Sequence, residues 1–130
     1  MPAPHVFEYA IIRLVPRVER EEFINVGVIL FCKESRFLEA RIELDEQRAR
    51  AFAPGIDLDD VRSHLAIIPL VCEGGPAAGP VGEFDQAERF RWLAAPRSTV
   101  IQTSPVHSGE THDPAAELDH LLKTMVLPAP

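Results

Sequence analysis

Hydrophobic residues fill the first third of the chain in patterns that predict β-strands. Val6–Val15 is β-branched and aromatic with only two charges, and Ile24–Lys33 is apolar on both faces, which is typical of strands buried on two sides. In Phe37–Leu44 apolar and polar residues alternate, so one face is expected to meet the core and the other water. Because the gap between the last two strands is short, we expect them to form an antiparallel hairpin.

After the predicted hairpin the apolar spacing changes to a helical period. Asp45 is expected to cap a short helix that runs to about Phe52. Asp57 is expected to cap a second helix, whose apolar stripe fades near Cys72. Pro69 lies late in that helix and is predicted to kink or end it.

The second half of the chain predicts two more helices and a short strand. Phe84–Ala95 has a helical pattern, Thr99–Thr103 is β-rich, and Asp113 followed by a proline is a strong helix start. In that last helix Leu118 and Leu122 lie four apart on one face, and both are expected to be buried. The order of elements predicts an α+β fold, with a small antiparallel sheet of three to four strands and helices packed mainly on one face.

The 130 residues predict a single domain. Residues 73–83 (EGGPAAGPVGE) hold four glycines and two prolines, and we interpret them as a flexible surface loop. Residues 127–130 are predicted to form a frayed tail. With 46% hydrophobic and 25% charged residues, the composition is that of an ordinary globular protein.

The net charge of −7, from 13 basic and 20 acidic residues, speaks against a surface that binds nucleic-acid phosphates. The longest apolar stretch is far too short for a membrane helix, and the N-terminus has no features of a signal peptide. We therefore expect a cytoplasmic protein that contacts neither membrane nor nucleic acid.

The residues between Arg97 and His107 form the sharpest candidate site. Arg97, Ser98 and Ser104 offer a guanidinium and two hydroxyls, and His107 adds an imidazole, which together are groups that hold phosphate or carboxylate. The alternative interpretation is that the serines cap turns and that Arg97 pairs with a surface carboxylate. One anion contacts both ends of this segment only if the chain bends back between them.

Arg13 and Asn25 are candidate ligand-binding residues inside predicted strands. A charge in an apolar strand is costly unless it is paired, so Arg13 must meet a partner from another element, reach solvent or face a ligand. Asn25 lies beside Gly27, which predicts a β-bulge or a close approach of another backbone or ligand.

The sequence shows no coherent catalytic or metal-binding pattern. His107 and His112 are separated by five positions without a cysteine to complete a zinc site, so no metal and no cofactor is predicted. Cys72 or Ser104 with His107 is a conceivable nucleophile and base, but no glycine elbow surrounds either residue. Cys32 and Cys72 both fit small buried hydrophobes.

Two stretches resemble a known family. They are Glu8–Pro16 with Arg20–Val28, and Phe90–Ser104 with Val106-His107 and Asp113-Pro114. Over nearly the whole chain this resembles the bacterial domain of unknown function 3037 family. The resemblance implies no known reaction. Members of that family are often encoded beside a protein that resembles the HipA-like kinases, which implies a protein partner.

Two classes of function stay open. The first is a small accessory or binding protein that acts through a protein partner such as a HipA-like kinase. The absence of a coherent catalytic pattern favours this non-enzymatic class. The second is a small enzyme or ligand-binding domain that holds an anionic molecule at the Arg97–His107 segment. The sequence does not indicate the oligomeric state.

Overall fold

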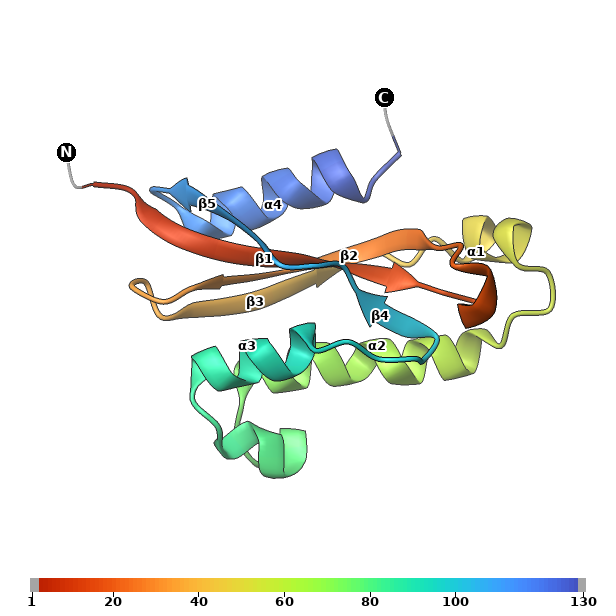
Figure 1. Cartoon of the computed structure of the whole chain (residues 1–130), viewed down its shortest axis with the longest axis horizontal. Coiled ribbons are helices and arrows are strands. Elements are labelled where there is room, and N and C mark those ends of the chain that lie inside the picture. The colour runs from red at the N-terminus through yellow and green to blue at the C-terminus, as the bar shows by residue number, and fades with distance from the viewer. Residues whose placement is uncertain (1–2, 129–130) are drawn as a thin grey trace.

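An antiparallel sheet of five strands forms the centre of the computed structural model, which describes residues 3–128 (Figure 1). The strands are β1 (His5–Leu14), β2 (Ile24–Cys32), β3 (Phe37–Ile42), β4 (Ile101–Thr103) and β5 (His107–Thr111). Their order is β3-β2-β1-β4, with β5 also paired to β1. The α+β prediction is confirmed, and the sheet has five strands rather than three to four.

The predicted hairpin of β2 and β3 is confirmed, and its turn lies at residues 33–36. The strand that the sequence missed is β5, which pairs with the first half of β1 while β4 pairs with the last three residues of β1. Between Ile12 and Arg13 the register of β1 against β2 shifts, because Val26 is an extra residue on β2. The bulge predicted beside Gly27 is therefore present.

Each face of the sheet packs against its own helices. Ile12 and Leu14 of β1 belong to a core with α2 (Leu58–Glu73) and α3 (Gln86–Ala94). Phe7 and Ile11 belong to a second core with α4 (Pro114–Met125). Figure 1 shows α4 on one side of the sheet and α2 and α3 on the other. The sequence pattern predicts helices mainly on one face of the sheet. In the structure α4 also covers part of the opposite face.

An aspartate caps the N-terminus of each α-helix in the described part of the chain. The side chains of Asp45, Asp57, Asp85 and Asp113 each accept a hydrogen bond from the backbone N–H three residues further on, which satisfies one of the free donors of the first turn. Asp45 caps α1 (Glu46–Phe52), as predicted. The start of α4 at Pro114 is also confirmed. None of the helices within residues 3–128 is, on its own, long and apolar enough to cross a membrane.

The structure details two places where the sequence predicts a break. Pro69 does not end its helix: α2 continues to Glu73, close to the expected fade near Cys72, because a proline in the last turns removes only one hydrogen bond of an already packed helix. Within the predicted surface loop at residues 73–83, Pro76–Glu83 forms 3₁₀ turns (η2) joined at Gly79. A second short 3₁₀ helix, η1 (Val18–Arg20), connects β1 to β2.

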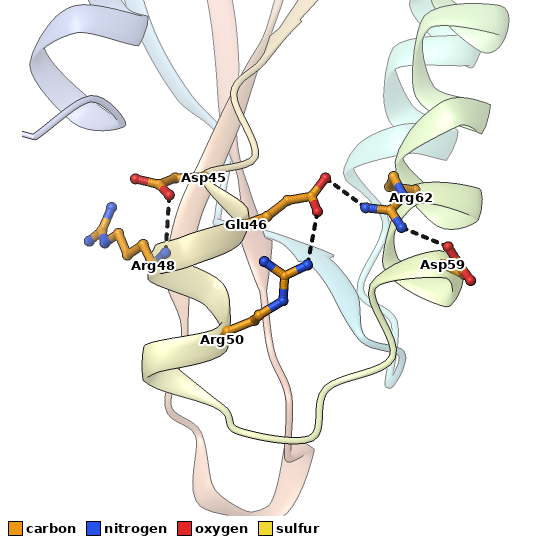
Figure 2. A network of polar contacts seen from close by, with 6 residues as sticks. All are labelled: Asp45, Glu46, Arg48, Arg50, Asp59 and Arg62. Carbon is orange, nitrogen blue, oxygen red and sulfur yellow. Dashed lines mark hydrogen bonds and ion pairs between the residues drawn. The ribbon is translucent and has the colours of Figure 1, made fainter.

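An ion-pair network joins α1 to the start of α2. Glu46 contacts Arg62 at 2.6 Å and Arg50 at 3.4 Å, and Arg62 also contacts Asp59 at 2.6 Å (Figure 2). All four side chains are substantially exposed, so each pair contributes little alone. The network therefore links the surfaces of α1 and α2 and adds little to the stability of the fold.

The last helix differs from prediction in one residue. Leu118 is fully buried, as expected, but Leu122 is only partly buried. The helix turns Leu121 and the following Val126 into the core instead, which leaves Leu122 at its rim. Of the predicted tail, Leu127 still bonds through its N–H to the carbonyl of Leu122, and residues 129–130 lie outside the described residues.

Candidate functional site

Arg97 folds back onto the end of α3. Its guanidinium donates hydrogen bonds to the carbonyl oxygens of Leu93 at 3.1 Å and Trp92 at 2.5 Å, and it lies 4.3 Å above the Trp92 ring. Arginine at this place satisfies carbonyls that the helix end leaves free. Burial lowers the pKa of Arg97 from its ordinary value. Arg97 is thus fixed by the protein rather than held by a surface carboxylate.

His107 lies on the other side of the sheet from Arg97. It pairs with Tyr9 across β5 and β1, and the two ring centroids are 5.4 Å apart. Tyr9 packs against the core that contains α4, whereas Arg97 contacts α3. The predicted pocket shared by Arg97 and His107 is therefore not formed. The segment forms two strands, β4 and β5, that both pair with β1 along its length. The chain therefore does not bend back on itself.

The two predicted serines separate in the same way. Ser104 is buried, and its hydroxyl accepts from the Ile11 N–H at 2.8 Å and donates to the Pro105 carbonyl at 2.9 Å. This is the turn-capping role that the sequence offered as the alternative, and it holds β1 where β4 ends and β5 begins. Ser98 is exposed on the connection before β4. Within the described residues, neither serine forms a side-chain hydrogen bond with His107.

A groove that the sequence did not predict lies around Trp92. It has a volume of about 90 Å³ and runs between α2, α3 and β4. Ile67 and Trp92 line it with exposed fractions of 47% and 36%, and the Thr103 hydroxyl in its wall is buried without a partner. We call this the tryptophan groove and define it by His64, Ile67, Trp92, Arg97, Thr99 and Thr103. One feature of the sequence could have indicated this groove: Ile67 is apolar but lies outside the buried stripe of its helix.

Arg13 and Asn25, the other predicted site residues, are brought together. They are register partners across β1 and β2, so their side chains leave the same face of the sheet. The Arg13 guanidinium lies 4.0 Å from the Phe23 ring centroid, and the Asn25 amide donates to the Met125 carbonyl at 3.0 Å. Both residues therefore stand where α4 ends.

A second cavity has a volume of about 710 Å³ and opens between η1, the α1–α2 turn and Val100. Its two arginines, Arg17 and Arg20, are each paired with a glutamate two residues away. Asp57 and Asp60 face the same space. The carboxylates that line this cavity are at least as numerous as the guanidinium groups. The cavity therefore does not present the positive surface that an anion needs.

Cys72 is unsuited to act as a nucleophile. It is buried, and burial raises the pKa of its thiol from the ordinary value of 9.0 to about 12. The reactive form of cysteine is the thiolate, which is nearly absent here at neutral pH. The interpretation of Cys72 as a small buried hydrophobe agrees with this position.

The raised pKa of Cys72 predicts a loss of stability at alkaline pH. The unfolded thiol ionises near pH 9 and the folded thiol only near 12, so its contribution is complete below pH 9 and falls as the pH rises towards 12. At about pH 10.5 the wild type should have lost about 2 kcal/mol more than Cys72→Ala, relative to pH 8. Urea unfolding of both proteins at the two pH values measures this difference, and equal losses contradict the prediction.

Comparison with known proteins identifies one family. A family model described as "Protein of unknown function (DUF3037)" matches residues 9–126. No curated protein and no solved structure matches the chain.

Proposed function

The chain belongs to the DUF3037 family of proteins of unknown function, and from its surface we propose that it is a small binding protein that holds a protein partner at the tryptophan groove. A HipA-like kinase is the partner to test first, because the family resemblance points to it. The proposal concerns binding only and assigns no reaction to this chain.

The observation that carries the proposal is the exposed Trp92 with Arg97 stacked on its ring at 4.3 Å. Tryptophan and arginine are the residues most enriched among those that dominate binding energy in protein interfaces. Two hydrogen bonds already hold the Arg97 guanidinium in place, so little side-chain entropy remains to be lost on binding. Exposed Ile67 extends the same surface with apolar area.

The positions of the candidate catalytic groups also support a binding role over an enzymatic one. Cys72 is buried with a raised thiol pKa, and the Ser104 hydroxyl is occupied by two hydrogen bonds to the backbone. A nucleophile requires a base within hydrogen-bond reach, and His107 contacts Tyr9 instead.

We expect Trp92→Ala to weaken the complex with a co-expressed HipA-like kinase by about 30-fold or more, the usual effect of removing a dominant interface residue. Isothermal titration calorimetry with the two purified proteins measures this change. Ile67→Asp should weaken binding as well, because it places a charge in the groove.

The matched control is Phe84→Ala, which removes another exposed aromatic side chain outside the groove. This variant should bind as the wild type does. A complex that tolerates both Trp92→Ala and Ile67→Asp contradicts the proposed site, and the absence of any complex with the wild type contradicts the proposed partner.

A further inference from the structure

Arg13 is a half-buried cation, and among residues 3–128 no carboxylate oxygen lies within 4.0 Å of it. The arginines at positions 17, 20, 41, 50 and 62 each pair with a carboxylate. A partly desolvated guanidinium in an apolar strand is costly when it stays unpaired, so the feature calls for an anionic occupant.

The surroundings of Arg13 hold the side chain in one place. Its Nε is buried and has no hydrogen-bond partner among the described residues. The Phe23 ring lies 4.0 Å from the guanidinium carbon, which fixes the plane of the group by stacking. The neighbouring Asn25 is itself anchored to the Met125 carbonyl, and its side-chain oxygen is buried without a partner. The fork of Arg13 is therefore presented between Phe23 and Asn25, on the face of the sheet that carries α4.

The charge and shape of this place select the class of ligand. A planar guanidinium matches a carboxylate with two parallel hydrogen bonds. A doubly charged phosphate needs more positive charge than one arginine supplies on a protein with a net charge of −7. Phe23, whose ring stacks on the Arg13 guanidinium, is exposed by 41% and offers apolar surface next to the charge.

We propose that Arg13 binds the carboxylate of an apolar acid, with Phe23 against the apolar part of the ligand. This site goes beyond the proposed function and does not depend on it. Arg13 leaves the sheet on the α4 side, as Ile11 does, whereas the tryptophan groove lies on the side of α2 and α3. The carboxylate belongs either to a free small molecule or to an acidic side chain flanked by apolar residues.

Titration of the ¹⁵N-labelled protein with sodium benzoate tests the proposal, with the arginine Nε–H signals as the readout. We expect the Arg13 signal to shift and saturate with a dissociation constant of about 1–10 mM, in the range of a single charged contact with some apolar area. Acetate should bind more weakly because it lacks the apolar part. The blocked peptide acetyl-Leu-Glu-Leu-amide is the second probe: tighter binding of benzoate assigns the site to a small molecule, and tighter binding of the peptide assigns it to a protein chain.

Variants separate a site from a general effect of charge. Arg13→Gln should abolish the benzoate shift of the backbone signals of Phe23 and Asn25, and Arg13→Lys, which keeps the charge, should weaken it about tenfold. Arg91→Gln removes an equal charge from exposed α3 and should change nothing. If Arg13→Gln fails to fold, Arg13→Lys and Phe23→Ala decide the matter. A shift that stays linear with concentration, or that survives in these variants, overturns the proposal.

Discussion

Replacing Gly27 by alanine is expected to reduce the free energy of unfolding by about 3 kcal/mol. A Cβ atom at this position would lie 2.7 Å from the carbonyl oxygen of Arg41 and 2.9 Å from the Cδ1 atom of Ile12. The first of these atoms belongs to the backbone of β3, so it moves only if the sheet moves. Gly27 stands beside the bulge at Val26, in the most buried strand of the molecule.

Gly109→Ala is the control for this prediction. A Cβ atom at position 109 would also meet a close neighbour, the Cζ atom of Phe7 at 2.8 Å. That atom belongs to the ring of Phe7, which is buried in the core with α4, but a side chain shifts more readily than the backbone of a central strand. Gly109→Ala should therefore cost less than Gly27→Ala, about 1–2 kcal/mol. Urea unfolding of both variants measures the difference, and equal losses would show that β3 yields as easily as Phe7 does.

The same two glycines show how much of the fold the sequence could predict. Long apolar strands and capped helices were predictable because their patterns are local: β2 carries its own hydrophobicity, and Asp57 stands next to the turn it caps. β5 was not predictable in this way, because its residues are polar and include Gly109. Its place depends on the ring of Phe7, which packs over that glycine from β1, and no pattern within residues 107–111 records this contact.

The candidate site was predictable to a smaller degree. The sequence pattern marks Arg13 and Asn25 as separate candidates, but their pairing depends on the extra residue Val26, which moves Asn25 into register with Arg13. Arg97 and His107 form one candidate site in the sequence because they are close in the chain. Arg97 instead finds the free carbonyls at the end of α3. Proximity in sequence therefore failed as a guide because strand pairing with β1 decided which face each residue reached.

Leu118→Ala is expected to have the largest effect of all, a loss of about 3–5 kcal/mol. Leu118 is fully buried between α4 and the sheet. Because α4 is the one α-helix that packs on its side of the described sheet, the space left by the leucine cannot be filled by a second helix. The cavity should stay largely open and keep its full penalty.

Leu122→Ala provides the comparison, because it removes the same atoms from the same helix at a partly buried position. It should cost about 1–2 kcal/mol, in proportion to the smaller apolar area lost. Thermal and urea unfolding of the two variants measure both losses. If Leu118→Ala costs no more than Leu122→Ala, then α4 contributes little to the isolated domain. The face of the sheet that carries Val28 and Leu30 would then have to be stable without α4. The Arg13 site would also lose the hydrogen bond by which Met125 anchors Asn25.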